Sequence, residues 1–397
     1  NTMSPREAKV HEIARILADN MEIPDIKNSG IGLYTGKFGP LMFFAHYVKR
    51  FPEEAFQPTL DRYLEACCDD LCNEVIYIYT FCSGLAGAMS SVRLMNRLSL
   101  IDLDISEVEA QYRTPMLRHM ALFLTHRPGN FDFMHGAMGI ALHFKDDPEF
   151  IENAVKWLSE NANRDDGFTK WKSVLNDKGQ IGYNIALSHG MSGIVLVLCR
   201  LYKAGVMQHE IEELVAGTIG YILSQEIDRS KYGSCFPSQS LENGDAIHRS
   251  RLGWCYGDLG VAAALWQAGK TFGRQNWKDK AMDVMLFTTQ RRDLKANSIA
   301  DAGLCHGGAG VAMMFKYMYD ETGDERFAET TNYWADATLD LATHEDGPAG
   351  YKRYTLETTP PWLDSYTMLE GIAGIGLILM STLDMEQKSE WTDLFLL

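Results

Sequence analysis

The sequence has no long apolar run, although 46% of its 397 residues are hydrophobic. Gly, Lys, Asp or His interrupts its longest apolar stretches, whereas a membrane-spanning helix needs about 20 consecutive apolar residues. Residues 1–20 are charged and amphipathic, and they lack the apolar core of a secretory signal. The sequence therefore predicts neither an integral membrane segment nor export, and we expect a cytoplasmic protein.

Positive charge is scarce as well. Lys and Arg number 37 against 53 Asp and Glu, which gives a net charge of −16. Because nonspecific binding to nucleic acid requires a cationic surface, we expect no nucleic-acid partner. The 8 cysteines are irregularly spaced, so we expect reduced thiols rather than a disulfide framework. No linker-like stretch divides the chain, and one domain is expected over residues 1–397.

Glycine, by contrast, recurs in a regular pattern. The motif G-x-x-G followed by an apolar helical stretch occurs seven times, and its first glycines are 48 to 67 residues apart. Recurrence at such a period indicates a repeat architecture. The glycine pairs are Gly36 and Gly39, Gly84 and Gly87, Gly136 and Gly139, Gly190 and Gly193, Gly257 and Gly260, Gly307 and Gly310, and Gly371 and Gly374.

Each repeat predicts a helical hairpin. The helix that begins at the glycines is apolar on most faces, as in residues 193–202, and such a helix is buried. The segments in between are amphipathic, as in residues 149–163, which suits an outer layer. We therefore expect an all-α fold, an α/α toroid of seven hairpins with an inner and an outer ring of helices. Two segments without helical periodicity, 164–190 and 228–257, are expected to form long loops over a pocket at one end of the ring.

Reactive side chains lie directly before the glycines of repeats three to seven, whereas repeats one and two have only hydroxyls and one cysteine there. In a closed ring these positions converge on one site. The reactive residues are Asp132 and His135, His189, Arg251 with Cys255 and Tyr256, Cys305 with His306, and Glu370.

Three of these residues favour a metal site. Cys255, Cys305 and His306 come from two neighbouring repeats, and two thiolates with one imidazole suit zinc. Three protein ligands leave one tetrahedral position open, which is typical of a catalytic zinc. The alternative is two packed thiols beside a hydrogen-bonded core histidine. The alignment of both cysteines at equivalent repeat positions favours the metal.

Three further residues each have a chemical and a structural interpretation. His189 could be a fourth ligand, a proton donor or acceptor, or a cap at a helix start. Asp132 could orient a histidine, carry a proton or act as an N-cap. Arg251 could stabilise developing negative charge or lie on the surface. For His135 and Glu370 the structural interpretation is at least as good as a catalytic one.

The chain resembles the lanthionine synthetase C-like family, which includes the stand-alone lanthipeptide cyclases. The resemblance rests on the motifs SHGMSG, WCYGDLG, CHGGAG and LEGIAG, which occur in this order within the sevenfold pattern. It implies an α/α toroid with one zinc ion per chain, held by Cys255, Cys305 and His306. It further implies a small insertion that contributes to peptide binding, which we expect in reduced form at about 98–128. The implied catalytic residues are Asp132, His189, Arg251 and Tyr256.

By this resemblance, the function would be zinc-dependent cyclisation of a dehydrated precursor peptide, as in antibiotic biosynthesis. A peptide cysteine would add to dehydroalanine or dehydrobutyrine and form a thioether (lanthionine) ring. A dehydratase is a further candidate partner. Two alternatives share the same zinc site. One is a glutathione transferase that adds glutathione to dehydroamino acids, and the other is a non-catalytic zinc-containing scaffold that binds a peptide.

Overall fold

The seven apolar segments form seven helices, which begin one or two residues after the first glycine of each motif. A computed structural model of the chain describes residues 2–397, and these counts refer to that range. The helices are α3 (Phe38–Arg50), α5 (Leu85–Arg97), α7 (Ala137–His143), α9 (Met191–Tyr202), α12 (Asp258–Phe272), α14 (Gly308–Thr322) and α16 (Ile372–Ser381).

Amphipathic helices form the outer layer. They are α1 (Pro5–Asp19), α4 (Gln57–Asn73), α6 (Ser106–Thr125), α8 (Pro148–Asn161), α10 (Gln208–Ser224), α13 (Gln275–Thr288) and α15 (Glu325–Asp340). The shorter helices are α2 (Pro24–Lys27), α11 (Arg229–Tyr232), η1 (Pro52–Glu54), η2 (Pro348–Gly350), η3 (Thr382–Asp384) and η4 (Glu390–Phe395).

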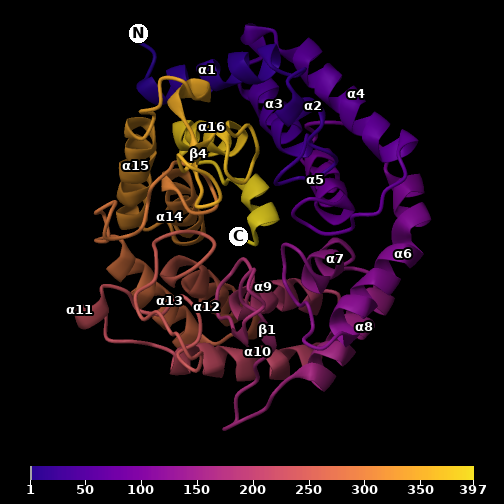
Figure 1. Cartoon of the computed structure of the whole chain (residues 1–397), viewed down its shortest axis with the longest axis vertical. Helices are drawn as coiled ribbons and strands as arrows, with labels where there is room; N and C mark the ends of the chain where they lie inside the picture. Colours follow the sequence, from indigo (N-terminus) through magenta and orange to yellow (C-terminus); the bar gives the residue numbers. More distant parts are fainter. Residues whose placement is uncertain (1) are drawn as a thin grey trace.

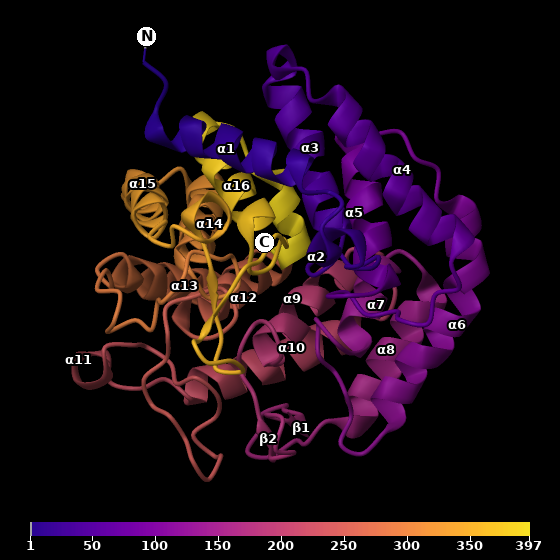
Figure 2. The same ribbon diagram turned by 45° about the horizontal axis from the view of Figure 1, so that its top comes forward.

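The helices form two concentric rings, so the predicted α/α toroid is confirmed (Figure 1). The ring is closed, because α16 packs against α14 on one side and against α3 on the other. The outer partner of α16 is α1, from the opposite end of the chain (Figure 2). The seventh hairpin is thus assembled from the two ends of the sequence.

Close packing explains the motif glycines. At Gly310, a Cβ atom would lie 2.0 Å from the carbonyl oxygen of Leu304, so a side chain there would push α14 away from its own preceding turn. Gly257 has a positive φ of 96°, a backbone conformation that residues with a Cβ rarely adopt. These glycines therefore serve the fold.

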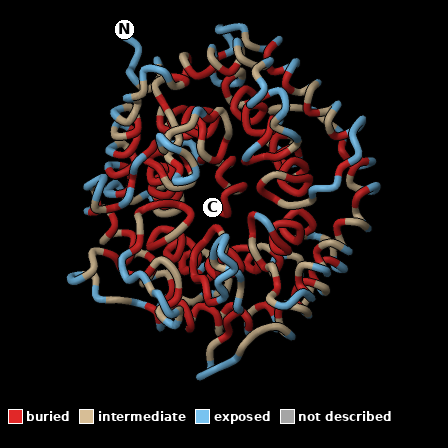
Figure 3. The backbone as a smooth tube through the Cα atoms, in the orientation of Figure 1, coloured by how far each residue is buried: buried red, intermediate tan, exposed pale blue. Residues whose placement is uncertain are grey.

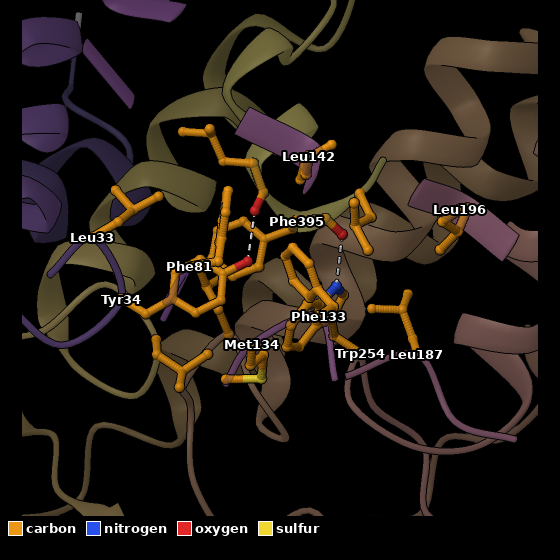
Figure 4. Close-up of a cluster of buried hydrophobic side chains, with 14 of the residues drawn as sticks. Leu33, Tyr34, Phe81, Phe133, Met134, Leu142, Leu187, Leu196, Trp254 and Phe395 are labelled. Atoms are coloured by element: carbon orange, nitrogen blue, oxygen red, sulfur yellow. Dashed lines mark hydrogen bonds between the residues drawn. The ribbon is translucent and has the colours of Figure 1, made fainter. Parts of the chain in front are cut away.

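The centre of the ring is filled by side chains. Buried residues line its inner side (Figure 3), and Phe395 of η4 occupies the middle (Figure 4). Phe395 stacks on Tyr34, with ring centroids 4.6 Å apart, and its carbonyl oxygen accepts a hydrogen bond from Trp254 Nε1 at 2.9 Å. The toroid is therefore a packed core rather than an open channel.

The segment expected to be a reduced insertion has a different structure. Residues 98–105 form a short connection, and most of the remainder is α6, an outer helix that packs on α7 and α8. The expectation for 98–128 is therefore corrected. The segment therefore belongs to the regular outer ring of helices and is not an insertion.

Connections from outer to inner helices lie at the end where the inner helices begin, which we call the mouth. The first segment predicted to be a long loop contains the antiparallel pair β1 (Lys172–Val174) and β2 (Ile181–Tyr183). A second pair, β3 (Arg353–Tyr354) and β4 (Trp362–Leu363), precedes α16. Within residues 2–397, no helix combines the length and the apolar character needed to cross a membrane.

Candidate metal centre

Backbone hydrogen bonds join the turns before the inner helices into a circle. In each repeat, we consider the residue two places before the first glycine of the motif. Its N–H donates to the carbonyl oxygen of the equivalent residue in the next repeat. Within residues 2–397, six of seven such bonds form, with N···O distances of 2.9–3.2 Å. They run from Tyr34 to Cys82, Cys82 to Met134, Ser188 to Cys255, Cys255 to Cys305, Cys305 to Leu369, and Leu369 to Tyr34.

This circle brings the three predicted metal ligands together. Cys255 N donates to Cys305 O at 3.2 Å, which makes the two cysteines neighbours across two repeats. One donor atom from each of Cys255, Cys305 and His306 lies within 4.8 Å of the others. We call these three residues the metal triad.

The triad has the chemistry of a zinc site. Asp301 Oδ2 lies 3.3 Å from His306 Nε2 and fixes the ring, so Nδ1 is the nitrogen left for a metal. Asp301 is itself held, because its Oδ2 accepts a hydrogen bond from Tyr354 N at 2.9 Å. Burial opposes protonation of His306, but the hydrogen bond to Asp301 and its charge outweigh burial and raise the pKa of His306 to about 8.

The sulfur atoms of Cys255 and Cys305 lie within 4.8 Å of each other, and each thiol shifts the pKa of the other. A hydrogen bond from Cys305 stabilises the thiolate of Cys255 and lowers its pKa, while the same contact raises the pKa of Cys305. One thiolate is thus favoured before any metal binds. Two sulfurs and an oriented imidazole fit zinc with one position open for another ligand. The triad therefore fits the predicted cofactor.

Asp132 and His189 form a hydrogen-bonded pair beside the triad. Asp132 Oδ2 lies 2.6 Å from His189 Nδ1. Burial opposes protonation of His189, but the charge of Asp132 and this hydrogen bond outweigh it, so the pKa of His189 is raised. Asp132 Oδ1 also accepts from the backbone N–H of Met134 at 2.7 Å. Its side chain thus contacts a histidine and also stabilises a turn. It does not act as an N-cap of α7, because the N-cap residue is Gly136 and that helix start has no side-chain cap hydrogen bond.

The circle of backbone bonds is interrupted at this pair. Within residues 2–397, the seventh bond, from Met134 N to Ser188 O, does not form, because Met134 N donates to Asp132 instead. We call this junction between repeats three and four the seam.

Tyr256 and Arg251 flank the triad and the pair. Tyr256 Oη accepts a hydrogen bond from Asn184 Nδ2 at 3.3 Å, and its ring centroid lies 6.3 Å from that of His189. The Arg251 side chain is half-buried and makes no hydrogen bond or ion pair within the described range 2–397. Its charge helps to lower the pKa of Cys255, after the larger effect of the Cys305 hydrogen bond. The roles of all four predicted catalytic residues stay predictions.

The two remaining candidates have structural contacts. The ring of His135 stacks on that of His189, with centroids 5.3 Å apart. Glu370 Oε2 pairs with Arg353 Nη1 of β3 at 3.1 Å and holds the second hairpin at the mouth.

Sequence reasoning missed Asp301. It lies six residues before the first glycine of its motif, and Arg251 and Asn184 occupy the same position in repeats five and four. All three reach the site in the structure, Asp301 through His306 and Asn184 through Tyr256. Comparison of this position across repeats could have found it.

Comparisons with known proteins agree with the geometry. Glutathione S-transferase LANCL1 of Danio rerio is 24% identical over 368 residues, which cover 85% of this chain and 81% of that protein. Nisin biosynthesis protein NisC of Lactococcus lactis subsp. lactis is 20% identical over 385 residues, which cover 87% and 84%. The solved structure of nisin cyclase matches with a TM-score of 0.73 at 17% identity, over 98% of this chain and 96% of that one, and it supports the fold.

The family model of the lanthionine synthetase C-like proteins matches residues 29–396, almost the whole ring and every residue of the candidate site. The chain belongs to the lanthionine synthetase C-like family.

Proposed function

We propose that the protein is a zinc-dependent lanthipeptide cyclase. The observation that carries the proposal is the metal triad. Bound to zinc, it would leave one ligand position open near the Asp132–His189 pair. The substrate would be a dehydrated precursor peptide that contains cysteine. Since a dehydratase must remove water from serine and threonine first, association with such an enzyme is part of the proposal. A cytoplasmic location is also part of it, because a reducing compartment suits the free cysteines.

Cys255, Cys305 and His306 would hold the zinc ion. When bound, zinc would lower the pKa of a coordinated substrate thiol, so that this thiol is a thiolate at neutral pH. Asp301 keeps His306 in the tautomer that a metal requires. The protein thus positions a sulfur nucleophile at the mouth.

The addition step joins this sulfur to the β-carbon of a dehydroamino acid. The C–S bond forms as the electron pair of the C=C bond moves toward the carbonyl and gives an enolate. His189, charged with the help of Asp132, then delivers a proton to the α-carbon. The net change is addition of S–H across the double bond.

Arg251 and Tyr256 would act on the same enolate. The guanidinium is half-buried and has no partner among residues 2–397, which suits a role beside the developing oxyanion. Tyr256 is the second candidate for proton delivery, although burial raises the pKa of its hydroxyl.

Glutathione addition is the second candidate function. It is supported by the similarity to a relative named as a glutathione S-transferase. The zinc site and proton donor would be the same, but the thiol would come from a separate molecule.

One experiment distinguishes the two functions. The zinc-loaded protein is incubated with a dehydrated peptide that contains one cysteine, with and without glutathione, and free thiols are counted by alkylation and mass spectrometry. The cyclase proposal expects loss of the peptide thiol at constant mass. If the peptide keeps its thiol and gains the mass of glutathione, the second function is correct.

The zinc site has its own test. Metal analysis should find about one zinc ion per chain, lost in Cys305→Ala. Cys82→Ala is the matched control, since Cys82 holds the same motif position in repeat two but does not belong to the metal triad. Full zinc content in Cys305→Ala would show that the ligand set is wrong.

A further inference from the structure

A cavity of about 270 Å3 opens at the seam, where the circle of backbone bonds is interrupted. We call it the seam pocket. It lies between the turn before α7, the start of α9 and the β1–β2 hairpin. Asp132 and His189 form part of its wall. The pocket is therefore continuous with the candidate proton donor.

The floor of the seam pocket is apolar. Phe131, Trp171, Met191 and Ile194 line it, and each is no more than 5% exposed. Val174 of β1 lies at its edge and is 54% exposed. The cavity is large enough for one aliphatic or aromatic side chain, while its edge remains open to solvent.

The carboxylate and amide side chains of the wall already have partners. Asp132 accepts from Met134 N and faces His189 Nδ1. Asn184 Oδ1 accepts from Ala186 N at 2.8 Å, and its Nδ2 donates to Tyr256. Asn130 is also engaged on both sides of its amide: Nδ2 donates to His135 O and Oδ1 accepts from Asp132 N. Among the described residues, the Ser173 hydroxyl and His189 Nε2 are the side-chain groups of the wall without a hydrogen bond. A polar ligand group would therefore find few free partners here, and most of its desolvation would go uncompensated.

The order of the repeats fixes the order of the three features around the mouth. The metal triad belongs to repeats five and six, His189 to repeat four, and the seam pocket to the junction of repeats three and four. A dehydroamino acid between the triad and His189 has its neighbour in the peptide on the far side of His189. That neighbour would reach the seam pocket, because His189 is part of the pocket wall.

We propose that the seam pocket is a specificity subsite for an apolar side chain of the substrate peptide. The side chain belongs to the residue next to the dehydroamino acid, on the side away from the reacting cysteine. This inference rests on the proposed cyclase function. It adds a preference that the metal triad and the Asp132–His189 pair cannot provide, because both act on groups that every substrate shares.

The test uses two dehydrated peptides that differ only at this flanking residue, leucine in one and asparagine of similar size in the other. The wild-type protein should cyclise the leucine peptide with a kcat/KM about tenfold higher or more, the discrimination that a hydrophobic pocket provides. The difference should lie mainly in KM, because the pocket binds a group remote from the reacting atoms.

Two variants test the position of the pocket. Val174→Trp covers its entrance from an exposed strand, and Ile194→Phe fills its floor. Each should raise KM for the leucine peptide to that of the asparagine peptide and leave the asparagine peptide unchanged. Ile181→Trp is the matched control, because Ile181 is the cross-strand partner of Val174 and is similarly exposed, at 52%, but does not line the pocket. It should keep the leucine preference.

Binding is measured separately with the same peptides carrying serine in place of cysteine, by fluorescence anisotropy. If the wild type binds the leucine peptide more tightly and Val174→Trp abolishes this preference, the subsite is supported. This holds even if no peptide is cyclised, and that result would contradict the proposed cyclase function alone. Equal binding of both peptides to the wild type, or loss of the preference in Ile181→Trp as well, overturns the subsite.

Discussion

At the scale of the residue, Asp132 determines the protonation of His189. In Asp132→Asn the negative charge at 2.6 Å is lost, so the pKa of His189 falls from its raised position. A proton donor works below its pKa, and the decline of kcat with rising pH should therefore begin at a lower pH. We also expect kcat to fall roughly 100-fold, the order of a lost acid–base contribution. A pH–rate profile of zinc-loaded protein measures both effects, and an unmoved alkaline limb would contradict this role.

Asp301 is the equivalent carboxylate on the metal side. Asp301→Asn removes the charge that faces His306 Nε2, and zinc affinity should fall about 10- to 100-fold, as for other carboxylate partners of metal-bound histidine. Competition with a chromophoric chelator gives the affinity. At saturating zinc the alkaline limb of the pH–rate profile should stay where the wild type has it, which separates this variant from Asp132→Asn. Unchanged affinity would mean that Asp301 only supports the β3–β4 hairpin.

The sequence predicts the contacts of some site residues better than those of others. The motif alignment predicted that Cys255, Cys305 and His306 would meet, because the backbone circle fixes their positions whatever their side chains are. The Asp132–His189 contact could not be derived in the same way. It depends on side-chain direction at the seam, the junction that lacks the regular backbone bond in the described part of the chain.

At the scale of the element, a buried ion pair fixes the long segment before α12. Asp258, the first residue of α12, is fully buried and lies 3.0 Å from Arg291 Nη1. Asp258 also accepts from the backbone of Cys235 and Phe236, and Arg291 Nη2 donates to Ser250 O at 2.7 Å. The pair thus holds residues 235–250 against the helix that Cys255 precedes.

Removal of the Arg291 guanidinium should destabilise the folded protein. In Arg291→Met, Asp258 is left as an uncompensated buried charge, and we expect the free energy of unfolding to fall by about 3–5 kcal/mol. Arg292→Met is the neighbouring control. Arg292 pairs at 3.1 Å with Glu329, whose side chain is 62% exposed, and such surface pairs contribute about 1 kcal/mol or less. Urea unfolding compares the two variants, and equal losses would contradict this assignment.

The predicted helices and their starting points are confirmed, because apolar periodicity and glycine pairs are local signals. The incorrect expectation of an insertion at 98–128 also has a local reason. Helix α6 has Pro115 in its interior and buries few residues, so its pattern is weak. The pairing of α1 with α16 had no local signal at all, since it joins residues more than 350 positions apart.

At the scale of the whole molecule, this long-range pairing closes the ring. Ile13 of α1 is fully buried and lies so close to α16 that a Cβ at Gly376 would be 3.2 Å from its Cγ2 atom. Ile13→Ala should lower the free energy of unfolding by about 2–5 kcal/mol, as for other large-to-small core substitutions. If residues 1–397 form one domain, as the sequence predicts, the whole unfolding transition should shift to a lower urea concentration in a single step.

Circular dichroism and tryptophan fluorescence during urea unfolding test this outcome, because tryptophans lie in several repeats. Coincident, shifted curves support one cooperative domain. A separate early transition in Ile13→Ala would mean that α1 and α16 unfold apart from the rest of the ring.

The backbone circle has a consequence for how this scaffold can change. Six of its seven junctions within residues 2–397 are held by backbone atoms alone, so the side chains at these equivalent positions can differ between repeats. Leu369 occupies the position next to Cys305, and its carbonyl oxygen accepts the N–H of Cys305 at 2.9 Å. A cysteine in that position would be placed to complete a four-coordinate shell and turn a reactive metal into an inert one. In the zinc site proposed above, a leucine at this position would leave the fourth ligand position to the substrate.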